Sequence, residues 1–109
     1  MKIEDAPFRV IDWPQVPKTN HPGEPGVASW HTVETGNVRA RIVEYSPGYR
    51  ADHWCSRGHV IFVIEGELVT EIQGGATHVL TAGMSYVVSG DLAPHRSSTA
   101  SGARIFIVD

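Results

Sequence analysis

The sequence predicts an all-β protein, folded as a single antiparallel β-barrel or sandwich. Eleven glycines and seven prolines divide the chain of 109 residues at short intervals, which leave little room for helices. The segments between these breaks are rich in β-branched and aromatic residues, which favour strands. Strands spaced in this way are typical of antiparallel barrels, and the length of the chain fits one domain.

The predicted strands cover seven segments, at residues 27–35, 38–45, 59–64, 68–72, 78–80, 85–88 and 104–108. Two hairpins are predicted among them. The first turns at Glu65-Gly66-Glu67, a short loop that contains glycine and joins two apolar runs. The second turns at Gly74-Gly75.

Residues 1–36 differ in composition from the rest, because five of the seven prolines lie there. We predict that this segment is an N-terminal arm and that residues 37–109 form the barrel. Large apolar side chains in the arm would be costly to expose to water, so we expect the arm to pack on the barrel or on a partner subunit. These side chains are Phe8, Val10, Ile11, Trp13 and Trp30.

Charge and hydropathy exclude two classes of partner. Nine basic and twelve acidic residues give a net charge of −3, with no run of Lys or Arg to follow a phosphate backbone, so nucleic acid is not expected. No apolar stretch reaches the roughly 18 residues of a membrane span. The first ten residues lack the pattern of an export signal, which predicts a cytoplasmic location.

Four side chains with nitrogen or sulfur donors are spaced to converge. In an extended strand, His53 and Cys55 point to the same side. His59 follows a turn at residues 56–58 and begins the next strand, and His95 follows a turn at residues 89–91. This pattern predicts a metal site formed by His53, Cys55, His59 and His95. Thiolate and imidazole suit a divalent transition metal, with Zn, Fe or Ni as the candidates, and disfavour Mg and Ca.

Other readings of these residues stay open. Cys55 could be a spectator thiol beside a three-histidine site, because buried cysteines are common. Tyr49 shares the face of His53 and is a candidate pocket residue, as is Tyr86 if its face of the strand points inward. The remaining histidines have no comparable placement, and we expect them to be structural or exposed: His21, His31 and His78.

The region from Gly48 to Thr99 resembles the cupin superfamily. The first cupin motif is matched by Gly48, His53, Cys55, His59 and Gly66, where Cys55 stands in place of a second His and His59 in place of a Glu. The second motif is approximated by Gly83, Ser89-Gly90-Asp91, His95 and Thr99, with Ser89 in place of Pro and His95 one residue late. Within the superfamily, Asp52-His53-Trp54-Cys55 is similar to the small bacterial cupins with a D-H-C-W-type motif.

This resemblance implies a cupin-type barrel, that is, a double-stranded β-helix or jelly roll, and it implies homodimers. It implies no settled activity. The usual cupin ligand set has three imidazoles and one carboxylate, whereas the matching positions here are His53, His59 and His95 with Cys55.

Three functions therefore remain. The first is a metal-dependent enzyme of the oxygenase or isomerase type, acting on a small polar substrate at open metal positions. The second is a non-catalytic module that binds a metal or a small ligand, which the lack of a Glu or Asp on the motif face favours. The third is a barrel without metal, in which the histidines hydrogen-bond to one another.

Overall fold

The structure is a computed structural model that describes residues 2–109. It contains one short 3-10 helix and eight strands, all paired antiparallel, which confirms the all-β prediction. The helix is η1 (Trp13–Gln15), and the strands are β1 (Lys18–Pro22), β2 (Val27–Thr35), β3 (Val38–Tyr45), β4 (His59–Ile72), β5 (Thr77–Thr81), β6 (Ser85–Val88), β7 (His95–Ser98) and β8 (Ala103–Val108). Among the described residues, no helix has the length and apolar character needed to cross a membrane.

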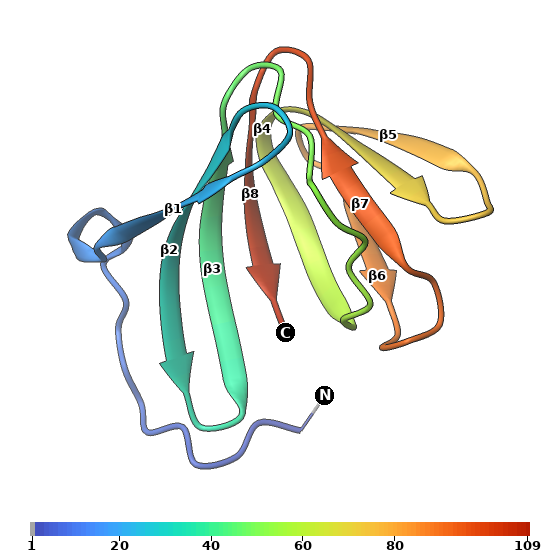
Figure 1. Ribbon diagram of the computed structural model, residues 1–109. Coiled ribbons are helices and arrows are strands. Elements are labelled where there is room, and N and C mark those ends of the chain that lie inside the picture. Colours follow the sequence, from blue (N-terminus) through green and yellow to red (C-terminus); the bar gives the residue numbers. More distant parts are fainter. Residues whose placement is uncertain (1) are drawn as a thin grey trace.

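The long strand β4 joins the two halves of the barrel (Figure 1). Its first half pairs with β8 and β6, and its second half pairs with β5 and β7. On the other side of β8, the sheet continues through β3 and β2 to β1 at the edge. The largest of the fully buried side chains lie on β3, β4 and β8 and belong to the hydrophobic core: Val43, Ile61, Val63, Leu68 and Ile105.

The hairpin predicted at Glu65-Gly66-Glu67 is wrong, because β4 runs through this segment without turning back. The register against β8 shifts between Val63 and Glu65, and Gly66 has a φ of 81°. A Cβ atom at Gly66 would overlap the carbonyl oxygen of Gly102 on the neighbouring chain segment. The glycine thus permits a bulge and a close backbone approach. The second predicted hairpin, at Gly74-Gly75, joins β4 to β5 as expected.

The segment predicted as an arm contributes two strands to the sheet, so residue 36 is not where the arm ends. Of the described residues, only 2–17 precede the first strand. Trp13 packs edge-on against Phe106, with ring centroids 6.1 Å apart, while Phe8 is 98% and Val10 81% exposed. Packing on the barrel thus accounts for the tryptophan but not for these two side chains.

Candidate metal centre

A cavity of about 370 Å³ opens inside the barrel next to the irregular segment that precedes β4. Its wall combines aromatic and aliphatic side chains from the core with histidines, a cysteine and arginines. Tyr49 and Tyr86, the candidate pocket residues, both line it, together with Trp30, Trp54, Cys55, His59, His95 and several residues of β3 and β8.

Three of the four predicted ligands meet on this wall. One donor atom each from Cys55, His59 and His95 lies within 4.8 Å of the other two. His59 begins β4 and His95 begins β7, and both are buried. Cys55 is placed by an isolated bridge to His95, in which Cys55 N donates to His95 O at 2.7 Å and His95 N donates to Cys55 O at 2.9 Å.

The structure does not bring His53 into this group. Its side chain is 77% exposed at the rim of the cavity, and Nδ1 lies 2.6 Å from Oδ1 of Asp52. The prediction assumed that alternate residues of a strand share a face. Residues 51–54 lie between two isolated bridges, at Arg50 and at Cys55, and the chain bends at residues 52–53, so the alternation does not apply to them.

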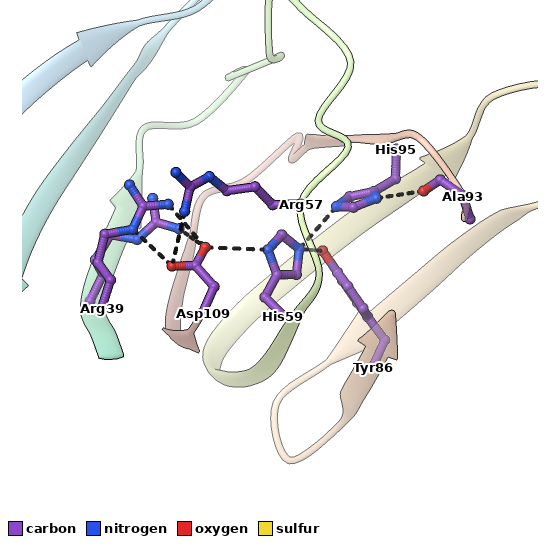
Figure 2. A network of polar contacts seen from close by, with 8 residues as sticks. Arg39, Arg57, His59, Tyr86, Ala93, His95 and Asp109 are labelled. Carbon is purple, nitrogen blue, oxygen red and sulfur yellow. Dashed lines mark hydrogen bonds and ion pairs between the residues drawn. The ribbon is translucent and has the colours of Figure 1, made fainter. Parts of the chain in front are cut away.

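Hydrogen bonds fix the orientation of the two buried imidazoles (Figure 2). Nδ1 of His95 lies 2.8 Å from the carbonyl oxygen of Ala93. Since a carbonyl only accepts, Nδ1 of His95 carries a hydrogen and its Nε2 has a lone pair. Nε2 of His59 lies 2.9 Å from this atom and must donate to it when nothing else lies between the two rings.

That arrangement leaves Nδ1 of His59 in an unfavourable position. The atom is buried, has no hydrogen-bond partner among the described residues, and faces Oδ2 of Asp109 at 3.7 Å. Without its hydrogen, the nitrogen and the carboxylate are two acceptors turned toward each other. A metal ion at Nε2 would reverse this, because Nδ1 of His59 would then carry the hydrogen and point it at the carboxylate, as metal-bound histidines commonly do.

The spacing of the donors also fits a metal. Two nitrogens that each lie about 2.1 Å from one ion are about 3.0 Å apart in octahedral geometry and about 3.4 Å apart in the tetrahedral geometry of zinc. The two Nε2 atoms are 2.9 Å apart. The cysteine and histidine donor set and the unpartnered Nδ1 atom therefore both fit a transition metal held at this point.

Tyr86 brings a hydroxyl group to the same place. Its Oη lies 3.1 Å from Nε2 of His59, and burial raises its pKa above the ordinary value, so the group stays a neutral phenol. Tyr49 is buried deeper in the core, with its ring centroid 4.7 Å from that of Tyr45. Of the two, only Tyr86 is within hydrogen-bonding distance of the cluster.

A set of charged residues that the sequence did not predict lies behind His59. Asp109 accepts two hydrogen bonds from Arg39, at 2.8 and 2.9 Å, and one from Arg41 at 3.1 Å, and Arg57 lies 3.8 Å away. Burial alone would raise the pKa of Asp109, but the arginines outweigh it and hold that pKa below the usual value. One available signal was the alternation of Arg39 and Arg41, which puts both on one face of the strand.

The other histidines lie away from the cluster. His21 stacks on Trp30 with ring centroids 3.8 Å apart, His31 lies 2.9 Å from the carbonyl oxygen of Val16, and His78 is exposed on β5. All three are thus structural or exposed histidines, as expected.

We predict that acid destabilises the metal-free protein through His59. Burial, reinforced by His95, lowers the pKa of His59 from 6.5 to about 4. The unfolded chain therefore binds a proton that the folded chain does not, and the free energy of unfolding falls as the pH drops from 6.5 toward 4. The full effect is about 3 kcal/mol, of which about 2 kcal/mol falls between pH 7.5 and pH 5. Urea unfolding at pH 7.5 and pH 5 measures it, and an equally steep pH dependence in His59→Gln would contradict the assignment.

No family model and no curated protein matches the sequence. Solved structures do match the fold. An RmlC-like cupin from Shewanella frigidimarina has a TM-score of 0.75 at 19% identity, over 95% of this chain and 91% of that chain. Ectoine synthase from P. lautus has a TM-score of 0.76 at 18% identity, over 93% of this chain and 76% of that one. Fe(II)-HppE with an alternative substrate has a TM-score of 0.76 at 15% identity, over 99% of this chain and 62% of that one. The predicted cupin-type barrel is therefore confirmed.

Proposed function

Starting from a cupin-type barrel, we propose that this protein binds one divalent transition metal ion through Cys55, His59 and His95. We further propose that it admits a small molecule to the same cavity. The observation that carries the proposal is the convergence of one cysteine and two histidine donors, from three separate segments, within 4.8 Å on the wall of a cavity. A metal ion at Nε2 of His59 would also put the ring hydrogen on the buried, unpartnered Nδ1 atom, where it would face the carboxylate of Asp109.

The donor set restricts the metal. Thiolate and imidazole favour Zn, Fe or Ni, and the Fe(II) form of HppE, which shares the fold, supports iron among them. A divalent ion with one thiolate and two neutral imidazoles has a formal charge of +1. Cys55 must remain reduced to act as a ligand, which fits the predicted cytoplasmic location.

Three protein ligands leave coordination positions open, as catalytic sites do and closed structural sites do not. A bound ion would supply Lewis-acid activation of a ligand at such a position. Ala93 holds the imidazole of His95 through Nδ1, and Asp109 faces Nδ1 of His59, so both Nε2 atoms stay aimed at one point. The phenol of Tyr86, which lies 3.1 Å from Nε2 of His59, can donate to a ligand bound there.

These features favour a metal-dependent enzyme of the oxygenase or isomerase type. One observation favours the alternative of a non-catalytic binding module. No Asp or Glu lies among the described residues that line the cavity, so the site offers no carboxylate as a general base. Apart from the proposed ligands, the described residues place one neutral hydroxyl group, that of Tyr86, within hydrogen-bonding distance of His59, and turnover would have to depend on this group or on water.

The reactivity of Cys55 tests the proposed ligand set. A metal-bound thiolate is shielded from alkylating reagents, so maleimide labelling of Cys55 should be slow in metal-loaded protein and several-fold faster after chelation. His95→Gln should label quickly with or without chelator, because the metal is no longer held. An unchanged labelling rate on chelation of the wild-type protein would remove Cys55 from the site and leave two histidines.

We also propose the homodimer that the sequence predicted. The support is the exposed apolar surface of the arm, where Phe8 and Val10 are 98% and 81% exposed and Ile3 is 60% exposed. Light scattering at micromolar concentration should give the dimer mass for the wild-type chain and the monomer mass for a Phe8→Ser, Val10→Ser variant. A soluble wild-type monomer would overturn this proposal.

A further inference from the structure

The wall of the cavity that holds Cys55, His59 and His95 carries an excess of positive charge. Four arginines line it, at positions 39, 41, 57 and 96, and no carboxylate does among the described residues. Arg96 is already paired with Glu71, at 2.6 and 3.3 Å, and its guanidinium lies 4.3 Å from the ring centroid of Trp54. The other three gather around Asp109, whose single negative charge balances one of them.

Arg41 is the least compensated of the three. Its side chain is 93% buried, its Nη2 donates to Asp109, and its Nε has no partner among the described residues. The guanidinium lies 4.4 Å from the centroid of the Trp30 ring, which holds it in place. Burial and the neighbouring Arg39 both lower its pKa, as expected for a cation without enough negative charge nearby.

Arg57 approaches the same point from the cavity mouth. Its Nη1 is 3.8 Å from Asp109, beyond hydrogen-bonding distance, and its side chain is 63% exposed. Both oxygens of Asp109 are engaged by Arg39. Arg41 and Arg57 therefore retain donors for a second anion, while Arg39 and Asp109 satisfy each other.

His59 connects this arginine cluster to the proposed metal. Its Nδ1 atom faces Asp109, and its Nε2 atom, on the other side of the ring, faces His95 (Figure 2). The arginines and the proposed metal site are therefore separated by about the width of one imidazole ring. A small ligand could place its anionic group against the arginines and another group at the metal site. The cavity volume of about 370 Å³ is at the small end of ligand sites and limits the size of such a molecule.

We infer that the cavity binds a small organic anion, a carboxylate or a phosphate ester, with its anionic group held by Arg41 and Arg57. Guanidinium groups bind both kinds of anion through paired hydrogen bonds. The less polar part of the molecule then lies against the aromatic and aliphatic wall formed by Trp30, Tyr49, Tyr86, Ile105 and Ile107. This inference rests on the proposed function in one respect, because it assumes that the anion is the small molecule that binds next to the metal ion.

Three ring compounds test this in chelated, metal-free protein at constant ionic strength. Benzoate and phenyl phosphate carry the two candidate anionic groups, and benzamide has the shape of benzoate without the charge. We expect at least one anion to bind about tenfold or more tightly than benzamide, because hydrogen bonds to charged groups are that strong. Quenching of tryptophan fluorescence reports binding, since Trp30 and Trp54 line the cavity. The anion that binds more tightly shows whether the site prefers a carboxylate or a phosphate ester.

Three substitutions locate the binding. Arg57→Gln should weaken the anion about tenfold. Arg41→Gln should weaken it at least as much, and if that variant does not fold, Arg57→Gln still decides, because its side chain is mostly exposed. Arg104→Gln is the matched control, since this arginine lies near Glu44 on another face and does not line the cavity. It should leave the affinity unchanged.

The inference is overturned if benzamide binds as well as both anions, or if Arg104→Gln weakens binding as much as Arg57→Gln. It is also overturned if neither anion binds, both in metal-free and in metal-loaded protein. Anion binding that depends on Arg57 in a protein that takes up no metal would instead overturn the proposed metal centre and support the anion site.

Discussion

His95→Gln and His59→Gln should each lower the affinity for a divalent transition metal by at least about a hundredfold. Substituting a residue that only orients a metal-binding side chain already lowers metal affinity about 10- to 100-fold. The two Nε2 atoms are 2.9 Å apart and both are buried, so no other side chain can take their place without rebuilding the cavity. Equilibrium dialysis followed by elemental analysis measures the change.

Two histidines serve as controls for this result. His78→Gln, on the exposed face of β5, should keep the wild-type affinity. His53→Gln should do the same, because the structure places this side chain 77% exposed at the rim, although the sequence pattern named it as a ligand. Wild-type metal content in both His59→Gln and His95→Gln would show that the site lies elsewhere.

Asp109→Asn should destabilise the protein by about 3 kcal/mol, since removing one partner of a buried ion pair leaves the other uncompensated. The carboxylate is 3% exposed and is the only acceptor that the structure gives to Arg41 among the described residues. Urea unfolding of the metal-free protein at pH 7.5 measures the change.

The control for this prediction is Glu71→Gln, which removes one partner of the more exposed pair with Arg96. Pairs exposed in this way contribute little to stability, so its unfolding midpoint should change little. Equal changes for Asp109→Asn and Glu71→Gln would contradict the structural role given to Asp109.

Local sequence patterns predicted most of the fold. Glycine and proline spacing identified β2, β3, β5, β6 and β8 and both halves of β4, because each is a β-branched segment between breaks. β1 and β7 were missed, since KTNHP and HRSS are polar and short. The error at Gly66 has a physical cause, because a glycine that allows a close approach to Gly102 cannot be distinguished in sequence from a glycine in a turn.

The site was predictable only in part for a related reason. Motif spacing named Cys55, His59 and His95, which the structure brings together. His53 lies apart from them because the backbone bends at residues 52–53 instead of continuing as a strand. The arginine cluster depends on β3 lying beside β8, which brings Arg39 and Asp109 together across 70 residues of sequence. No local pattern contains that pairing.

Elemental analysis of the untagged protein, purified without added metal, tests the metal centre most directly. We predict close to one equivalent of Zn, Fe or Ni per chain in the wild-type protein, and much less in a His59→Gln, His95→Gln double variant prepared in parallel. A wild-type protein that contains no transition metal, and takes up none of the three when each is supplied in excess, would contradict the proposal and leave His59 and His95 as a hydrogen-bonded pair.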